Sequence, residues 1–336
     1  MKRSIVACIP LYNGRNFIGA SLKSVLEQTR PPDEVIIVDD GSTDGGAEVA
    51  REVARGDNRV CVLTKENGGQ SSARNMGVRN SKSDLIAFLD QDDWWYPKHL
   101  ETLEAAAGPE PQVGPFGWVY SDLDEYDRDG NLVVRQMLKR LGSEHPKRTI
   151  FNCLSQNMYV LPSASLISRE AFEAVGGFDE RLSGYEDDDL FLRLFRAGYT
   201  NRFLREALSA WRIHGDSASY SARMARSALI YADKLLVAFP DDVPLRRYYA
   251  RDLITPRFFR SAAGTYRIAG QCGSAELLMP ALALIDRITP TMRIRRWLIM
   301  RAIRPFLGSH LVAKLASLEF TRSFVSRVLA ISGVWQ

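Results

Sequence analysis

Residues 84–95 read DLIAFLDQDDWW, an apolar run that ends in three carboxylates and two tryptophans. The run is short and apolar, so it predicts a buried strand of a parallel sheet. Three runs upstream have the same character, namely SIVACI (4–9), EVIIVDD (34–40) and RVCVLT (59–64). Helical patterns separate these runs, at FIGASLKSVLEQT (17–29), GGAEVAREVAR (45–55) and SSARNMGVRNS (71–81). This alternation predicts βαβ units and a parallel sheet covered on both faces by helices.

Polar segments follow three of these predicted strands, in residues 10–14 (PLYNG), 39–45 (DDGSTDG) and 90–93 (DQDD). Ligands of open parallel sheets bind beyond the carboxyl ends of the strands, so the three segments should meet at one crevice. Residues 39–45 also suit a simple turn that caps the following helix.

The carboxylates of residues 90–93 repel one another unless a positive charge lies between them. Mg²⁺ and Mn²⁺ take oxygen ligands, commonly one or two carboxylates together with substrate phosphates. In an extended segment Asp90 and Asp92 point to the same side. Surface turns also contain Asp-x-Asp, but the position directly after a strand favours a metal site.

Further along the chain, the pattern predicts a hairpin over residues 116–134, a strand over 163–168 and a short helix over 169–175. The next predicted helix begins with four acids, EDDD (186–189), and acids at a helix N-terminus also suit the macrodipole. From about residue 217 onward nearly every pattern is helical.

Composition and charge set limits on the function. Residues 1–220 hold 26 basic and 33 acidic side chains, a net charge of −7, whereas residues 221–336 hold 18 and 7, a net charge of +11. The chain contains no G-x-G-x-x-G and no P-loop motif, which disfavours nicotinamide and ATP enzymes of those types. No apolar run is long enough for a transmembrane helix, and the run before Pro10 is too short for a signal peptide. We therefore expect a cytoplasmic protein.

Several ordered motifs together resemble one protein family. Residues 9–45, 67–77 (NGGQSSARNMG) and 85–101 resemble the nucleotide-sugar half of family 2 inverting glycosyltransferases of the bacterial polysaccharide-assembly type. Residues 163–199 resemble the acceptor half with its Glu-Asp motif, and WRIHGDSAS (211–219) resembles the Arg-x-His segment that closes the site. The resemblance covers residues 3–220 and leaves 221–336 outside it.

The resemblance implies an α/β fold of the GT-A type, with a mostly parallel central sheet flanked by helices and a C-terminal helical extension. We expect a glycosyltransferase domain over residues 1–220, with a nucleotide-binding half (1–105) and an acceptor half (106–220). Residues 221–336 are expected to form a basic α-helical region.

Roles for individual residues also follow from the resemblance. The expected donor-nucleotide contacts are Pro10, Tyr12, Asp40, Asn67, Gln70, Arg74 and Asp90. Asp92 and His214 would bind a divalent metal, Mn²⁺ or Mg²⁺, although a solitary histidine is more often a surface or core residue. Asp93 and Glu186 would lie by the donor sugar, and Asp187 would be the general base. Trp94 and Trp95 are candidates for acceptor contact, with core packing as the alternative.

The implied function is metal-dependent, inverting transfer of a sugar from a nucleotide-sugar, with a UDP-sugar as the expected donor. The acceptor would be a saccharide or a lipid-linked saccharide in cell-surface polysaccharide synthesis. One alternative is a nucleotidyl or phosphoryl transferase with the same carboxylate metal site. Another is a catalytically inactive scaffold that binds sugar nucleotides. The Glu-Asp and Arg-x-His motifs favour the glycosyltransferase, and an inactive scaffold would be expected to have lost Asp92 or Asp187.

The basic tail has its own alternatives. Residues 289–308, TPTMRIRRWLIMRAIRPFLG, mix arginines with large apolar residues. They suit a helical bundle, an oligomer contact, or peripheral contact with an anionic membrane at the inner face of the plasma membrane. The sequence contains no recognisable nucleic-acid-binding module, so we expect no nucleic-acid partner.

Overall fold

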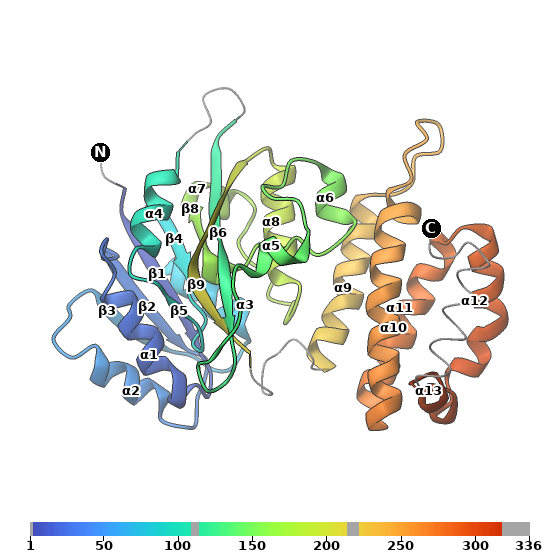
Figure 1. Cartoon of the computed structure of the whole chain (residues 1–336), viewed down its shortest axis with the longest axis horizontal. Helices are drawn as coiled ribbons and strands as arrows, with labels where there is room; N and C mark the ends of the chain where they lie inside the picture. Colours follow the sequence, from blue (N-terminus) through green and yellow to red (C-terminus); the bar gives the residue numbers. More distant parts are fainter. Residues whose placement is uncertain (1–2, 109–113, 214–221, 318–336) are drawn as a thin grey trace. The chain divides into compact units, whose positions relative to one another are not determined.

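The computed structural model describes residues 3–108, 114–213 and 222–317 (Figure 1). The chain divides into two compact units. Unit 1 comprises residues 1–152 and 158–217, and unit 2 comprises residues 153–157 and 218–336.

The strands of unit 1 form one nine-stranded sheet in the order β3-β2-β1-β4-β8-β6-β9-β5, with β7 paired to β6. Their bounds are β1 (Ile5–Leu11), β2 (Glu34–Asp39), β3 (Val60–Thr64), β4 (Leu85–Phe88), β5 (Trp94–Trp95), β6 (Phe116–Tyr126), β7 (Leu132–Val134), β8 (Ser165–Ser168) and β9 (Thr200–Arg212). The four runs predicted as buried strands are the strands β1, β2, β3 and β4. β1, β2 and β4 are buried as predicted, whereas β3 lies at the edge of the sheet and none of its residues is buried, so the predicted burial is wrong for β3.

Helices connect these strands, as the alternating pattern predicts. Their bounds are α1 (Arg15–Leu26), α2 (Gly46–Val53), α3 (Gln70–Arg79), α4 (His99–Ala106), α5 (Met137–Leu141), α6 (Ile150–Leu154), the 3₁₀ turn η1 (Pro162–Ala164), α7 (Arg169–Ala174) and α8 (Glu186–Arg196). All seven residues of β1 are buried, because the strand is covered on both faces. On one face of the sheet, buried side chains of the strands pack with those of α1, α2 and α4 in one hydrophobic core.

The direction of the strands changes along the sheet. β1, β2, β3 and β4 are mutually parallel, as expected of βαβ units. Beyond them, β8 is antiparallel to both β4 and β6, while β9 is parallel to β6 and antiparallel to β5. The sheet is therefore parallel across β1, β2, β3 and β4 and mixed beyond them.

β9 is an element that the sequence pattern did not indicate. Its residues 200–208 include several exposed or half-buried charged side chains, so neither a strand period nor an apolar run stands out. It is held instead by pairing to β6 along most of its length and to Trp94 and Trp95 of β5. Its last residue, Arg212, comes to lie beside the acidic segment that follows β4.

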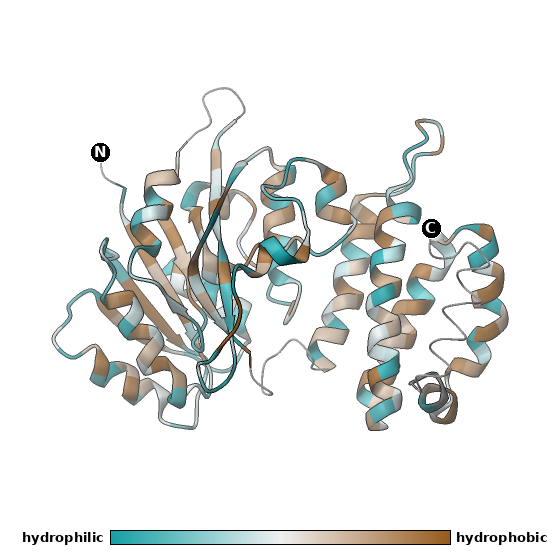
Figure 2. Ribbon diagram, viewed as in Figure 1, coloured by the Kyte–Doolittle hydropathy of each residue, from teal (hydrophilic) through white to brown (hydrophobic). Residues whose placement is uncertain are grey.

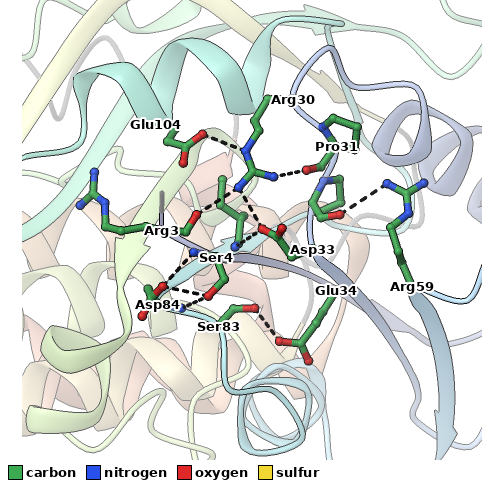
Figure 3. Close-up of polar contacts among 12 residues, drawn as sticks. Arg3, Ser4, Arg30, Pro31, Asp33, Glu34, Arg59, Ser83, Asp84 and Glu104 are labelled. Atoms are coloured by element: carbon green, nitrogen blue, oxygen red, sulfur yellow. Dashed lines mark hydrogen bonds and ion pairs between the residues drawn. The ribbon is translucent and has the colours of Figure 1, made fainter. Parts of the chain in front are cut away.

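A polar network joins the chain at the amino ends of the parallel strands, opposite the edge where the acidic segments lie (Figure 3). Arg30 Nη2 donates to Asp33 Oδ2 at 2.9 Å, and the same carboxylate oxygen accepts from the Ile5 backbone N at 2.8 Å. Asp84 Oδ2 accepts from the Ser4 backbone N, also at 2.8 Å. These carboxylates bond backbone donors at the strand starts, so they stabilise the register of β1.

Unit 2 is helical. Its elements are α9 (Ala222–Ala238), a π-helical turn η3 (Ala250–Ile254), α10 (Thr255–Cys272), α11 (Ala275–Ile288), the 3₁₀ turn η4 (Thr289–Thr291), α12 (Ile294–Leu307) and α13 (His310–Ser317). A small core joins α10, α11 and α13 through Tyr266, Leu278, Leu282 and Ala313. Across the described ranges, no helix has both the length and the apolar character needed to cross a membrane.

Candidate active site

The segment after β2 is organised around the carboxylate of Asp40. Asp40 Oδ1 accepts from Lys65 Nζ at 2.7 Å and from the Gly68 backbone N at 2.9 Å, and Oδ2 accepts from the Gly69 backbone N at 2.7 Å. Gly69 has a φ of +88°, a backbone conformation that favours glycine. Asp40 is buried, so it holds the 65–69 loop at the start of α3. Asn67, another predicted donor contact, lies exposed on this loop.

The segment after β1 is tied to the segment after β4. The Tyr12 backbone N donates to Gln91 Oε1 at 2.7 Å, and Gln91 Nε2 donates back to the Tyr12 carbonyl at 3.1 Å. The Tyr12 side chain is 44% exposed, so its ring is accessible for stacking. Pro10 precedes it as a buried residue of β1. Gln91 was not among the predicted site residues, because an Asp-x-Asp pattern draws attention only to its carboxylates.

Arg74 links two acidic groups that are far apart in the sequence. Its Nη2 donates to Asp90 Oδ1 at 2.6 Å, and its Nη1 donates to Glu186 Oε1 at 3.2 Å. Gln70 Nε2 donates to the same Asp90 oxygen at 2.8 Å. The Arg74 side chain is only 2% exposed. Arg74 therefore lies beneath the site and positions two carboxylates, which differs from the predicted direct contact with the nucleotide.

Asp93 is buried in the turn that follows β4. Its Oδ1 accepts from the Arg212 backbone N at 3.0 Å. Burial raises the pKa of the Asp93 carboxyl well above its ordinary value, and the charges of Asp92 and Asp90 raise this pKa further. The three carboxylates thus lie close enough for their charges to affect one another.

Ser163 of η1 contributes to this turn, and the sequence reasoning missed it. Its Oγ accepts from the Asp90 backbone N at 3.1 Å, and its carbonyl accepts from Trp95 Nε1 at 2.8 Å. No local sequence pattern marks a serine in the run SASLIS (163–168) as a site residue, because its partners, Asp90 and Trp95, lie about 70 residues earlier in the chain. Through these two hydrogen bonds, Ser163 fixes the backbone of the turn that carries Asp90, Asp92 and Asp93.

The acids at the start of α8 divide into different environments. Asp188 Oδ1 accepts from the Met158 backbone N at 2.8 Å, and Asp189 forms an ion pair with Arg193 at 2.8 Å. Asp187 Oδ1 accepts from the Asp188 backbone N at 2.8 Å. Burial raises the pKa of Asp187 well above its ordinary value, and the charges of Asp188 and Glu186 raise it further. Asp187 is therefore a carboxylate with increased basicity, the property that a general base needs.

The two tryptophans differ in accessibility. Trp95 is 2% exposed, its ring stacks on His99 with centroids 4.5 Å apart, and its indole N–H is bonded to Ser163. It is a core residue, and an acceptor sugar has no access to its ring, so the predicted acceptor contact is wrong for Trp95. Trp94 is partly exposed, with the Arg212 guanidinium 5.0 Å from its ring centroid.

The predicted metal ligands are placed only in part. His214 lies outside the described residues, so the metal pair Asp92–His214 has one described member. Within the described part of the chain, no group of three or more His, Cys, Asp or Glu residues is arranged to hold a metal ion. The member that is described, Asp92, offers carboxylate oxygens, the type of ligand that Mg²⁺ and Mn²⁺ take together with substrate phosphates.

Solved structures resemble this chain over nearly its whole length. Staphylococcus aureus TarS 1–349 in complex with UDP-GlcNAc matches with a TM-score of 0.63 at 18% identity, over 94% of this chain and 89% of that one. The mannosyltransferase PcManGT from Pyrobaculum calidifontis, in complex with GDP-Man and Mn²⁺, matches with a TM-score of 0.56 at 17% identity, over 100% and 88%. These similarities confirm the predicted GT-A-type α/β fold with its helical C-terminal region.

Sequence comparisons give the family. A Rickettsia prowazekii protein, uncharacterized glycosyltransferase RP339, is 31% identical over 215 residues, which are 64% of this chain and 65% of that protein. The chain thus spans just under two thirds of this relative's length. Residues 153–214 match a family described as the N-terminal domain of galactosyltransferase. Residues 6–176, just over half of the 336 residues, match the family described as glycosyl transferase family 2. The chain therefore belongs to glycosyl transferase family 2.

Proposed function

We propose that this protein is an inverting glycosyltransferase that moves a sugar from a nucleotide-sugar, expected to be a UDP-sugar, to a saccharide or lipid-linked saccharide. The main support is Asp187, a carboxylate with a raised pKa at the start of α8. Its neighbour Glu186 is joined through Arg74 to Asp90, which follows β4. A candidate base is thereby linked to the carboxylates on the donor side.

In this reaction the acceptor hydroxyl oxygen attacks the anomeric carbon of the donor sugar. The bond from that carbon to the diphosphate oxygen breaks, and Asp187 takes the hydroxyl proton. One base near the acceptor suffices for inversion, since no covalent sugar–enzyme intermediate forms. General base catalysis of this kind contributes roughly 10²–10⁴-fold to the rate.

The donor would lie over the carboxyl ends of β1, β2 and β4. The exposed ring of Tyr12 would stack on the base, and Asp40 and the 65–69 loop would line the base pocket. Asp40 is only 2% exposed and already accepts three hydrogen bonds, so it would act by holding the 65–69 loop in place at the base pocket. Asn67, Gln70 and Asp90 would contact the nucleotide, and Asp93 and Glu186 would support the donor sugar.

A divalent metal fits the acidic turn. Asp92, with His214, would hold Mn²⁺ or Mg²⁺, which when bound neutralises charge on the departing diphosphate. Burial is the main cause of the raised pKa of Asp93, and the charges of Asp92 and Asp90 add to it, so a cation bound at Asp92 would relieve part of this repulsion. PcManGT, which shares the fold, is described in complex with Mn²⁺.

Location at the inner face of the bacterial plasma membrane is also part of the proposal, in line with a lipid-linked acceptor in cell-surface polysaccharide synthesis. The excess of arginine in residues 221–336, with a net charge of +11, supports contact with an anionic membrane.

The test is a donor screen that measures nucleoside diphosphate release with and without Mn²⁺. We expect release from a UDP-sugar that depends on the added metal. Asp92→Ala should abolish metal-dependent donor binding in calorimetry, whereas Asp129→Ala, which changes an exposed turn residue, should leave it intact. Metal-dependent binding that persists in Asp92→Ala would remove Asp92 from the metal site. If no nucleotide-sugar is turned over, the proposed activity is wrong.

A further inference from the structure

Helix α12 exposes most of its large apolar side chains to solvent. Met300 is the one residue of α12 that is fully buried. The exposed apolar residues are Ile294, Leu298, Ile299, Ile303 and Phe306, and two of them, Ile294 and Phe306, are each 67% exposed. A surface helix of a globular protein normally has the opposite arrangement, with apolar residues inward.

The geometry of the helix places these side chains on one side. At about 100° per residue, Ile294, Leu298 and Phe306 lie about 120° or more around the helix axis from Met300. Ile299 lies about 100° from Met300, and Ile303 lies at the edge of the exposed arc, about 60° from it. The inward arc carries Arg304, which forms a hydrogen-bonded ion pair with Asp286 of α11 at 2.7 Å. Leu307 packs against the small core of unit 2. The helix therefore packs in unit 2 through the side that carries Met300, Arg304 and Leu307, and its exposed apolar residues lie on the rest of its surface. Figure 2 shows hydrophobic and hydrophilic residues following one another along α12.

Charge on the same helix indicates the kind of partner. α12 contains four arginines and no acidic residue. Arg295 and Arg301 are exposed and fall within or beside the apolar arc. Apolar side chains with arginines beside them are the composition of helices that lie in the interface of an anionic bilayer.

We propose that the outward face of α12, formed by Ile294, Leu298, Ile299, Ile303 and Phe306 with Arg295 and Arg301, docks on an anionic lipid bilayer. The helix would lie parallel to the surface, with the apolar side chains at the level of the headgroups and upper acyl chains and the guanidinium groups beside lipid phosphates. This inference deepens the membrane contact proposed above by naming its surface. It does not depend on the transfer reaction.

Two other occupants of this face fit the charges less well. A second copy of the chain would bring together two regions that each carry a net charge of +11. The chain's own residues 318–336 contain Arg322 and Arg327 against Glu319, so they offer no acidic complement to the arginines. Anionic lipid is the partner whose charge is opposite.

The experiment measures binding of the full chain to vesicles of phosphatidylglycerol and phosphatidylcholine, without donor, at low and high salt. We expect binding to anionic vesicles that weakens with salt, and little binding to pure phosphatidylcholine. The double variant Leu298→Ser/Phe306→Ser should lower the partition coefficient about tenfold or more. Arg295→Gln and Arg301→Gln should each lower it about fivefold.

Matched control variants test whether lipid binding depends on the α12 face or on any exposed apolar or basic residue of unit 2. Val237→Ser changes an exposed apolar residue of α9, and Arg246→Gln changes an exposed arginine outside α12, so both should bind as the wild type does. All substituted side chains are exposed, and unchanged thermal unfolding midpoints would verify that the variants fold.

Several results would overturn the inference. A wild-type dimer that Leu298→Ser/Phe306→Ser dissociates, without vesicle binding, would assign the face to a second copy. A monomer that binds no vesicles would mean that the chain itself covers the face. Vesicle binding that the α12 variants leave unchanged would place the contact elsewhere. Nucleoside diphosphate release, measured separately, reports on the proposed activity and is independent of all three.

Discussion

Arg74 is the residue on which the geometry of the site depends most. It is buried, and its two terminal nitrogens bond the carboxylates of Asp90, which follows β4, and Glu186, at the start of α8. The planar guanidinium can bond both at once, whereas a lysine ammonium provides a single point charge. Removing one partner of a buried ion pair leaves the other charges uncompensated, and this costs more than the pair itself contributes.

We expect Arg74→Met to reduce the free energy of unfolding by about 3 kcal/mol. This is the lower end of the range for buried pairs, because the Asp90 side chain is 27% exposed. Arg74→Lys should recover part of that stability but not the rate of transfer, since it cannot hold Asp90 and Glu186 together. Arg79→Met, on the same helix with an exposed side chain, should cost less than about 1 kcal/mol. Urea unfolding and steady-state kinetics measure both effects; full activity in Arg74→Met would exclude a positioning role.

The ionised carboxylate of Asp187, which the proposed reaction needs as a base, lowers the stability of the folded protein. Its pKa in the folded protein is raised by burial and by Asp188 and Glu186. A carboxyl with a raised folded pKa contributes stability that is present below the unfolded pKa and is lost as pH rises through the folded pKa. Above its raised folded pKa, the ionised Asp187 therefore opposes folding.

The variant Asp187→Asn should bind donor normally and lose transfer, because an amide cannot take the hydroxyl proton. Its thermal midpoint should exceed that of the wild type by a few degrees at about pH 8, and the difference should shrink towards about pH 5. Glu173→Gln, an exposed change on α7, should alter neither property. Retained transfer would refute Asp187 as the base, and a lower midpoint at about pH 8 would contradict the sign of the pKa shift.

At the scale of elements, β9 and η1 complete the site: β9 ends at Arg212, the first residue of the Arg-x-His segment, and η1 carries no motif of its own. β9 pairs with β6 over most of its length and delivers the Arg212 backbone N to Asp93. η1 presents Ser163 to the Asp90 backbone. The acidic turn after β4 is thus held from two sides by segments 70 or more residues later in the chain.

The packing of α10 against α13 permits a sharp test of unit 2. A Cβ at Gly270 would lie 2.1 Å from the Ala313 carbonyl oxygen, whereas a Cβ at Gly264 on the same helix meets nothing within 4 Å. Gly270→Ala should therefore destabilise unit 2 by about 1–3 kcal/mol through overpacking. Gly264→Ala should stabilise the helix by roughly 0.5–1 kcal/mol. Thermal unfolding measures both; a stabilising Gly270→Ala would contradict the close approach of the two helices.

For the whole molecule, the two compact units predict two unfolding transitions in calorimetry. Donor nucleotide should raise only the transition of unit 1, since the candidate site residues that the structure describes lie there. At about 100 times its dissociation constant a ligand contributes ~2.7 kcal/mol, which corresponds to a shift of about 5–10 °C. Gly270→Ala should lower only the other transition. A single transition that UDP and Gly270→Ala both shift would show that the units unfold together.

The sequence by itself determined the first four strands, their helices and the acids that follow the strands. These features depend on local patterns, because a strand buried on both faces must be apolar along its length. The helical character of the tail is local in the same sense. Family membership likewise follows from ordered motifs within residues 6–176.

The tertiary structure alone decided which of these residues meet. Arg74 and Glu186 are 112 positions apart, and no local pattern in the chain pairs them. Burial of Trp95, the pairing of β9 and the outward apolar face of α12 likewise depend on contacts with distant segments. The hydrophobic periodicity and the composition of the sequence indicate which residues are suited to burial. Which residue each of them contacts is set by how the sheet and the helices pack.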